Sequence, residues 1–332
     1  MKKIIKVICR QLIFFVVALP LILSACKTEE TEKLLDFEEP YGLVNVSVCN
    51  MRPVPAHNTE LISQAVMGTP VKILKLKSGW YYIQTPESYE GWVPAQAIRS
   101  MELSEFEKWK GSDRIIYTEK YGDIYGDTVA MKIISDIVAG SIIKLKKQEP
   151  NYYHLVLPDG REGYLHKDEA IVFDEWLADT EPREESLKKW AEIHKGVPYL
   201  WGGTSSKAFD CSGFVKTVYY LNGLILARDA SQQFDYGIKI SKEAYPDSLR
   251  LGDLLFFGYD NEGNVRPTHV GMYIGDTEFI HASGMVKVNS LDSTRNNFSH
   301  GRRDSFLGAR RIIGAGRADG LQFISSHPWY TN

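Results

Sequence analysis

Short segments of alternating hydrophobic and polar residues fill residues 43–99 and 127–172 of the chain. Alternation of this kind is typical of half-buried β-strands, and the glycine-rich positions between the segments are typical of turns. No helical pattern interrupts either stretch, so both are predicted to be small all-β structures. In the first stretch the clearest strand candidates are Leu43–Val48, Val71–Leu76, Trp80–Gln84 and Gly91–Val93.

The second stretch repeats the first at an offset of 72 residues (152 − 80), so that Trp80 corresponds to Tyr152. We therefore predict two copies of a small β-barrel, at residues 43–100 and 111–173. Most repeat positions pair an aromatic residue with another aromatic residue. Tyr89 does not, because Arg161 stands at its repeat position. This difference suggests that Tyr89 serves something beyond packing.

Helical spacing appears outside the two β stretches. Leu103–Lys110 could form a short helix between the barrels, and Ser186–Lys195 is predicted to be a helix after them. One face of the second helix carries Leu187, Trp190, Ala191 and His194. We expect His194 to be a solvated residue at the helix end rather than a ligand. The acidic segment Asp174–Glu185 contains Pro182 and is predicted to be a linker.

A glycine-rich loop at 197–213 leads into a third helical pattern. The apolar residues of that pattern are Phe214, Val215, Val218, Tyr219 and Leu221, so Cys211 stands where the helix begins. The first-turn N–H groups and the helix dipole favour a negative charge there, which lowers the pKa of a thiol. A small buried core cysteine is the alternative, but the polar, glycine-rich surroundings argue against it. We interpret Cys211 as a nucleophile.

Two histidines flank a predicted β-hairpin further along the chain. If the turn is centred on Gly275, His269 lies directly opposite His281, since both are six residues away. Residues opposite each other across two strands share a face of the sheet. One histidine could then accept the proton of the thiol while the other orients its ring.

At these residues the chain resembles the NlpC/P60 cysteine peptidases over about residues 185–316. The motifs, in order, are Tyr-x-Trp-Gly-Gly, Asp-Cys-Ser-Gly, Arg-Asp-Ala-Ser-x-Gln, Gly-Asp-Leu-Leu-Phe-Phe, His-Val-Gly-Met-Tyr-Ile-Gly and Ile-His-Ala-Ser. The resemblance implies an α+β fold with a papain-like catalytic domain, which cuts bacterial cell-wall peptides. It implies a catalytic triad of Cys211, His269 and His281. The segment Gly-Trp-Tyr-Tyr-Ile…Gly-Trp-Val resembles the bacterial SH3-like domain, so the two barrels are expected to be SH3-like.

Barrels followed by such a domain resemble the γ-D-glutamyl-L-diamino acid endopeptidases, which cut after L-Ala-γ-D-Glu. The expected chemistry is attack by a thiolate of Cys211, paired with an imidazolium of His269, with backbone N–H groups at the helix start holding the oxyanion. The resemblance implies that a free N-terminal amine of the murein peptide is bound. The expected substrate-binding residues are Tyr199, Trp201, Asp210, Ser212, Ser231 and Tyr89.

Each of these binding residues has a structural alternative. Tyr199 and Trp201 could pack in the cleft. Asp210 could simply cap the helix, and Ser231 could satisfy a turn. For the whole chain, the alternative functions are an inactive peptidoglycan-binding scaffold and an amide-forming acyltransferase.

The first 25 residues are predicted to be a secretory signal peptide, with four basic residues before the apolar run Leu12–Leu23. The segment Leu23-Ser-Ala-Cys26 resembles a bacterial lipoprotein cleavage box, which implies lipidation of Cys26. Residues 26–42 would then be a polar tether to the membrane. The expected location is the bacterial cell envelope, with the protein lipid-anchored and periplasmic.

Composition narrows the remaining possibilities. The net charge is −3 and no basic block occurs, so no nucleic-acid partner is expected. Of the four cysteines, Cys9 lies in the signal peptide and Cys49 is predicted to be a buried strand residue, so no disulfide is required. No spacing of metal ligands is present, and we predict neither a metal nor another cofactor.

Overall fold

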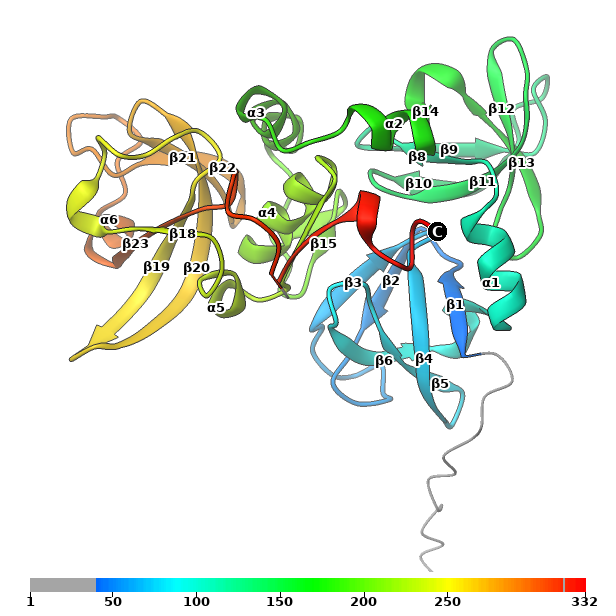
Figure 1. Cartoon of the computed structure of the whole chain (residues 1–332), viewed down its shortest axis with the longest axis horizontal. Coiled ribbons are helices and arrows are strands. Elements are labelled where there is room, and N and C mark those ends of the chain that lie inside the picture. Colours follow the sequence, from blue (N-terminus) through cyan, green and yellow to red (C-terminus); the bar gives the residue numbers. More distant parts are fainter. Residues whose placement is uncertain (1–39, 319) are drawn as a thin grey trace, which may run out of the picture. The chain divides into compact units, whose positions relative to one another are not determined.

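The computed structural model describes residues 40–318 and 320–332, and these form a mixed α/β structure with more strand than helix (Figure 1). The predicted signal peptide, Cys26 and the tether up to residue 39 lie outside the described residues. The first strand begins at Tyr41, so the last two residues of the predicted tether belong to a sheet. None of the helices in the described part of the chain is long and apolar enough to cross a membrane.

Residues 41–101 form the first β module. Its five-stranded antiparallel sheet has the order β6-β5-β4-β1-β7, and β2 pairs separately with β3. Cys49 lies on β2 and is 1% exposed, which confirms its predicted place in a buried strand. The elements are β1 (Tyr41–Val44), β2 (Val48–Met51), β3 (Ser63–Val66), β4 (Pro70–Lys77), β5 (Trp80–Gln84), β6 (Glu90–Pro94), η1 (Ala95–Ala97) and β7 (Ile98–Met101).

Residues 114–172 form the second β module, a seven-stranded sheet in the order β10-β9-β13-β12-β11-β8-β14. The starts of β4, β5, β6 and β7 recur 72 residues later as the starts of β11, β12, β13 and β14 (142 − 70). The repeat predicted from the sequence is therefore a repeat of strands. The elements are β8 (Arg114–Tyr117), β9 (Tyr121–Tyr125), β10 (Ile133–Val138), β11 (Ile142–Gln148), β12 (Tyr152–Val156), β13 (Glu162–His166), η2 (Lys167–Glu169) and β14 (Ala170–Val172).

Two short helices flank the second module. Helix α1 (Leu103–Lys110) lies where the sequence predicts it. Helix α2 (Phe173–Asp179) occupies half of the predicted linker, because Phe173 and Trp176 are one turn apart and both become buried. The helix was not predicted, because the acidic residues around that pair are typical of a linker. The guanidinium of Arg114 lies 4.5 Å from the ring of Phe173, which holds the helix against the sheet.

The remaining residues, from 184 on, surround a six-stranded sheet in the order β18-β23-β19-β20-β21-β22, and helix α4 packs against β20 and β21 (Figure 1). A single apolar core of α4 and strand side chains fills this interface. The elements are α3 (Glu184–Ile193), β15 (Thr204–Ser205), β16 (Ala208–Phe209), α4 (Cys211–Tyr220), β17 (Leu224–Leu226), α5 (Ala230–Gln233), β18 (Ile238–Ile240), η3 (Lys242–Ala244), β19 (Leu254–Asn261), β20 (Asn264–Gly275), β21 (Glu278–Ser283), β22 (Met285–Ser290), α6 (His300–Asp304), β23 (Phe306–Arg311), β24 (Leu321–Phe323) and η4 (Ile324–Ser326).

The third domain was predicted to end at residue 316, but a strand and a short helix follow that residue. Strand β24 pairs with β17, and the buried residues Ile324 and Tyr330 pack with aromatic residues of α1 and α2. A three-residue strand is too short for its periodicity to be recognised, which explains why this segment was missed.

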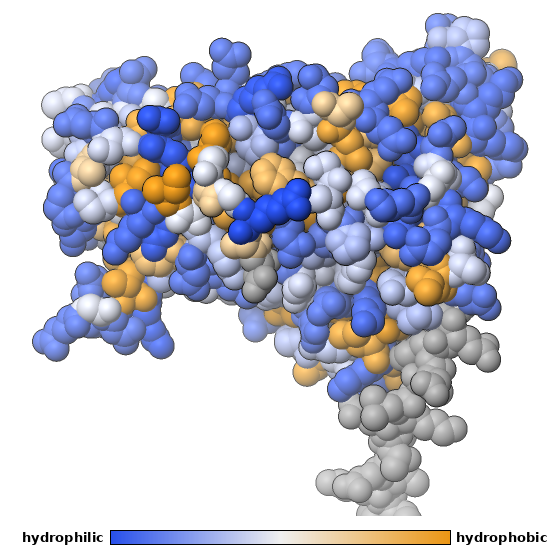
Figure 2. All heavy atoms as spheres, viewed as in Figure 1, coloured by the Kyte–Doolittle hydropathy of each residue, from blue (hydrophilic) through white to orange (hydrophobic). Residues whose placement is uncertain are grey.

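On the face shown in Figure 2, hydrophilic residues predominate and hydrophobic residues occur in small groups. Among the large hydrophobic residues that are exposed, only one run of three is consecutive within the described chain. It consists of Tyr199, Leu200 and Trp201, which are 36%, 38% and 61% exposed. These residues lie ten to twelve positions before Cys211 (211 − 199 = 12), in the loop that leads to α4. Exposed aromatic residues in such a loop are typical of a binding site.

Candidate active site

Cys211 is the first residue of α4, as the sequence predicts, and its side chain is 8% exposed. Asp210 caps the helix, since its Oδ1 atom accepts a hydrogen bond of 2.7 Å from the backbone N–H of Gly213. A Cβ atom on Gly213 would lie only 2.0 Å from the carbonyl oxygen of Gly203. Gly213 is therefore required, because the loop and the first turn of the helix are in direct contact there.

Burial dominates the electrostatics of the thiol. It raises the pKa of Cys211, and the carboxylate of Asp210 raises it further. Hydrogen bonds from the backbone N–H groups of Val270 and Ser212 lower the pKa but do not reverse the shift. The helix start therefore does not by itself produce a thiolate. The contact with Val270 also shows that the thiol lies against the residue that follows His269.

His269 on β20 and His281 on β21 are both buried, and Nε2 of His269 lies 2.7 Å from Nδ1 of His281. The register differs from the predicted one. The turn lies at Asp276–Thr277, where φ is +51° and +65°, and Met272 pairs with Ile280. Continuing that register places Gly271, not His269, opposite His281. The two histidines are thus diagonal neighbours that still share a face of the sheet.

Gly271 is needed for this arrangement. A Cβ atom at position 271 would lie 3.1 Å from Cβ of His281 and 2.8 Å from the ring of Phe279. Without that atom, β21 can approach β20 closely enough for the histidine rings to meet. In the sequence this glycine belongs to the motif His-Val-Gly-Met-Tyr-Ile-Gly, which gives no indication of its role.

Asn289 on β22 completes a row across three strands and was not predicted from the sequence. Its Oδ1 atom lies 2.9 Å from Nε2 of His281, and its Nδ2 atom donates to the carbonyl oxygen of Asn297 at 2.8 Å. The second hydrogen bond fixes the amide, so Oδ1 must accept from His281. Nδ1 of His281 is then the acceptor for Nε2–H of His269. Nδ1 of His269 is left with the free lone pair and can accept a proton.

Burial also keeps the histidines neutral. It lowers the pKa of His269 to about 2, and the positive charge of Arg302 contributes in the same direction. The pKa of His281 is lowered to about 4, again mainly by burial, while the hydrogen bond to Asn289 raises it. With the raised pKa of Cys211, these shifts favour a neutral thiol and a neutral imidazole. The imidazolium–thiolate pair expected from the sequence is not the resting state that these surroundings favour.

Tyr199 and Trp201 lie in the loop before α4. The backbone N–H of Tyr199 donates to the carbonyl oxygen of Gly284, which ties the loop to the turn between β21 and β22. Burial raises the pKa of Tyr199 to about 12, and the charges of Cys211 and Asp210 raise it as well. The phenol is thus close to the nucleophile and protonated at neutral pH. Trp201 is more exposed than Tyr199, so simple cleft packing does not account for it.

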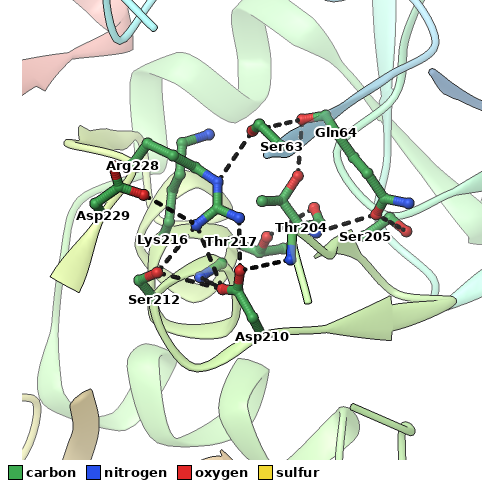
Figure 3. A network of polar contacts seen from close by, with 12 residues as sticks. Ser63, Gln64, Thr204, Ser205, Asp210, Ser212, Lys216, Thr217, Arg228 and Asp229 are labelled. Carbon is green, nitrogen blue, oxygen red and sulfur yellow. Dashed lines mark hydrogen bonds and ion pairs between the residues drawn. The ribbon is translucent and has the colours of Figure 1, made fainter. Parts of the chain in front are cut away.

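Asp210 and Ser212 belong to a buried polar network centred on Arg228 (Figure 3). Nη2 of Arg228 donates to Oδ2 of Asp210 at 2.6 Å, and Nη1 donates to Oγ of Ser212 at 3.0 Å. Oδ2 of Asp210 also accepts from the backbone N–H of Gly202. Both oxygens of the carboxylate are engaged, and the charge is balanced within the network.

The first β module closes this network from the other side. Oγ of Ser63 accepts from Nε of Arg228 at 3.0 Å (Figure 3). Oε1 of Gln64 accepts from the backbone N–H of Thr204 at 3.0 Å and from the hydroxyl of Ser205 at 3.1 Å. Strand β3 of the first module is therefore bonded directly to the loop that precedes Cys211.

Tyr89 makes a contact that its repeat partner does not make. Its hydroxyl donates a hydrogen bond to the carboxylate of Asp229, and burial raises the pKa of Tyr89 to about 12. Arg161, at the same repeat position, donates instead to Ile134 of its own module. The structure thus gives Tyr89, whose repeat position holds Arg161, a partner next to Arg228.

Ser231 and His194 are the remaining residues singled out from the sequence. Ser231 lies on the exposed side of α5, and its side chain makes no hydrogen bond within the described residues. His194 is fully buried instead of solvated, and its ring bonds to the carbonyl oxygen of Trp190 and to Oγ of Ser206. The helix end is covered by the loop at 206, which the periodicity of α3 cannot reveal.

No group of three or more His, Cys, Asp and Glu side chains in the described part of the chain is arranged to hold a metal ion. The site therefore consists of a thiol, two neutral imidazoles and an amide, bordered by aromatic side chains and a buried ion pair. This set can transfer an acyl group through a thioester.

Comparison with known families supports that chemistry. Residues 196–303 match the NlpC/P60 family, and residues 51–98 match the bacterial dipeptidyl-peptidase SH3 domain. The chain carries an NlpC/P60 domain. This domain contains the thiol and all three residues of the row across the sheet, and the SH3 domain contains Ser63, Gln64 and Tyr89.

Two curated relatives are similar over most of this chain. A γ-D-glutamyl-L-lysine dipeptidyl-peptidase of Bacillus cereus is 28% identical over 265 residues, covering 76% of this chain and 76% of that protein. Dipeptidyl-peptidase 6 of Lysinibacillus sphaericus is 29% identical over 267 residues, covering 76% of this chain and 92% of that protein. A crystal structure of an NlpC/P60 family protein from Bacillus cereus has a TM-score of 0.71 at 24% identity, and the alignment covers 82% of this chain and 99% of that one. That structure supports the fold.

Proposed function

We propose that this protein is a cysteine endopeptidase that cuts cell-wall peptides between γ-D-glutamate and an L-diamino acid. The observation that carries the proposal is the row His269–His281–Asn289, whose hydrogen bonds leave Nδ1 of His269 free to accept a proton. The next residue in the chain, Val270, contacts the thiol of Cys211. A relative that is similar over 76% of this chain is named a γ-D-glutamyl-L-lysine dipeptidyl-peptidase, which supports this choice of bond.

In the proposed reaction, Nδ1 of His269 takes the thiol proton of Cys211 as sulfur attacks the γ-carbonyl carbon. The first-turn N–H of Cys211 has no partner within the helix and can donate to the developing oxyanion. The phenol of Tyr199 is a second donor near the thiol. When the C–N bond breaks, His269 returns the proton to the leaving amine. Water then attacks the thioester and gives its proton to His269. The C–S bond breaks, His269 returns the proton to the sulfur of Cys211, and the peptide leaves with a free glutamyl γ-carboxylate.

We further propose that the free N-terminal amine of the substrate is bound where the SH3 domain meets the NlpC/P60 domain. Tyr89 and Asp229 support this, because the phenol and the carboxylate are hydrogen-bonded across that boundary. Asp229 is better suited than Asp210 to receive an ammonium group. Its side chain is 44% exposed and lies 4.0 Å from Arg228, whereas both oxygens of Asp210 are occupied. Asp210 and Ser212 then act by holding the Arg228 network, and Ser231 and Trp201 border the opening.

The test is hydrolysis of L-Ala-γ-D-Glu-L-Lys and of its N-acetylated form. We expect the free tripeptide to be preferred by about tenfold to a hundredfold in kcat/KM, the range for a charged hydrogen bond. The Tyr89→Phe variant should lose part of that preference, while Tyr81→Phe, in the same domain, should retain it. Equal kcat/KM for both peptides would refute recognition of the amine. An intact tripeptide in the presence of an enzyme that hydrolyses other amides would refute the assigned bond.

The remaining features of the architecture belong to the same proposal. We infer that the second β module is also SH3-like, since its strands repeat those of the first. We infer as well that the catalytic domain is papain-like, with a nucleophile helix packed on a sheet that carries the base.

We also infer that Cys26 is lipidated, which would anchor the enzyme in the cell envelope with murein peptides as its partners. Inhibition of lipoprotein processing in cells should leave a larger precursor, and an unchanged mass would contradict the anchor.

A further inference from the structure

Arg302 on α6 is a half-buried cation without a polar partner. Within residues 40–318 and 320–332, its guanidinium forms no ion pair and no hydrogen bond, and it lies over the ring of Phe257, 5.6 Å from the centroid. The neighbouring Arg303, by contrast, donates to the carbonyl oxygen of Leu291. Arginine loses part of its hydration at a half-buried position, so a guanidinium without a hydrogen-bond acceptor there is available to donate to a ligand.

The position of Arg302 relates it to the reacting groups. Phe257 on β19 is the direct strand partner of His269, and their ring centroids are 5.8 Å apart. The positive charge of Arg302 also interacts with the thiol of Cys211 and with Tyr199. The guanidinium is therefore at the rim of the site, on the side of the base.

A second cation lies on the same side. Lys287 on β22 is the direct strand partner of His281, is exposed, and forms no ion pair or hydrogen bond within the described residues. The charges of Arg302 and Lys287 both lower the pKa of the two histidines. The acid that acts on the thiol is Asp210, which is already paired with Arg228. Two uncompensated cations thus face the reacting groups in a chain whose net charge is −3.

We infer that Arg302 binds a carboxylate of the substrate, with Lys287 adding to the positive potential at the same rim. This inference rests on the proposed function, because a peptide cut between γ-D-glutamate and a diamino acid carries a carboxylate on each side of the scissile bond. One is the α-carboxylate of the glutamyl residue, and the other is that of the diamino acid. A guanidinium can hold either in a two-pronged hydrogen bond while the scissile carbonyl faces Cys211.

The experiment compares three peptides on the full chain: L-Ala-γ-D-Glu-L-Lys, the same peptide amidated at the glutamyl α-carboxylate, and the same peptide amidated at the lysine carboxylate. We expect Arg302→Gln to lower kcat/KM for the first peptide by about tenfold to a hundredfold. The amide that removes the bound carboxylate should lower the wild-type value by a similar factor, and Arg302→Gln should then cause little further loss. For the other amide the full loss should remain, which identifies the carboxylate that is bound.

Two control variants are measured alongside Arg302→Gln. Arg302→Lys keeps the charge and should recover part of the activity on the first peptide, which a protein that failed to fold could not do. Lys239→Gln removes a charge from β18, at the opposite edge of the sheet, and should leave all three values unchanged.

The inference is overturned if Arg302→Gln hydrolyses the first peptide as well as the wild type does, or if it loses the same factor on all three peptides. The second outcome would mean that Arg302 acts on the thiol rather than on the substrate. In both cases wild-type hydrolysis stands, so the proposed function survives. If the wild-type enzyme hydrolyses none of the three peptides, the proposed function itself fails and the inference falls with it.

Discussion

Nε2 of His269 and Nδ1 of His281 lie 2.7 Å apart on neighbouring strands, and this hydrogen bond decides which nitrogen of His269 can accept a proton. His281 can only accept at Nδ1, because its Nε2–H donates to Asn289. The role of His281 is thus to hold one tautomer of His269, and the role of Asn289 is to hold one tautomer of His281. The row His269–His281–Asn289 therefore leaves Nδ1 of His269 as the nitrogen that can accept a proton.

Asn289→Leu should lower kcat with little change in KM, because the variant loses the acceptor that fixes His281 but leaves the rim of the site intact. The loss of such a buried hydrogen bond predicts a decrease of about tenfold to a hundredfold. Asn289→Asp keeps an acceptor and adds a negative charge, so it should retain more activity and move the acidic limb of the kcat profile to higher pH. Steady-state kinetics over a pH series measure both effects. A profile for Asn289→Leu that coincides with the wild-type profile would remove Asn289 from the mechanism.

Alkylation of Cys211 by iodoacetamide should accelerate steadily as the pH rises above neutrality. Burial and Asp210 raise the pKa of this thiol, and burial lowers the pKa of His269, so the thiolate is scarce at pH 7. Cys49, whose pKa burial raises to about 12, provides an internal unreactive control in the folded protein. The rate is followed by mass spectrometry of the two cysteine peptides. A rate that is already at its plateau from about pH 6 would instead indicate a preformed thiolate–imidazolium pair.

Buried His194 should make stability depend on pH. Burial lowers its pKa from 6.5 to about 4 in the folded chain. Above pH 6.5 the residue is neutral in both states, and the full stability is present. As the pH falls from 6.5 towards 4, only the unfolded chain takes up the proton, so the free energy of unfolding decreases, by about 3 kcal/mol at pH 4.

Urea unfolding at a series of pH values measures this decrease. His194→Gln cannot take up the proton, and its stability should decline less than that of the wild type over the same interval. His269, His281 and His327 also have pKa values lowered by burial and contribute to the remaining decline. If the free energy of unfolding falls with pH equally for the wild type and for His194→Gln, the pKa of His194 does not differ between the folded and the unfolded chain.

The parts of the fold that the sequence predicts are those with local signals. Helix α1 follows from its periodicity, and the start of α4 at Cys211 follows from the glycine-rich loop and the apolar spacing after it. The offset between Trp80 and Tyr152 predicts the repeated strands. Helix α2 was missed because two apolar residues among acidic ones do not form a recognisable stripe.

The parts of the site that the sequence does not predict depend on register and burial. Counting from Gly275 misplaces the partner of His281 by two residues, because the turn lies at Asp276–Thr277. Continuing the correct register through the next strand would have led to Asn289, since Lys287 opposes His281. The pKa directions of Cys211 and His269 depend on desolvation by residues distant in sequence, and no local motif carries that information.

The most direct test of the account is the incubation of L-Ala-γ-D-Glu-L-Lys with the wild-type protein and with Cys211→Ala, with the products identified by mass spectrometry. The wild type should release the dipeptide L-Ala-γ-D-Glu and free lysine. Cys211→Ala should release neither, while its circular dichroism spectrum and unfolding midpoint stay close to those of the wild type. A tripeptide that remains whole with the wild type, or equal product from Cys211→Ala, would contradict the account.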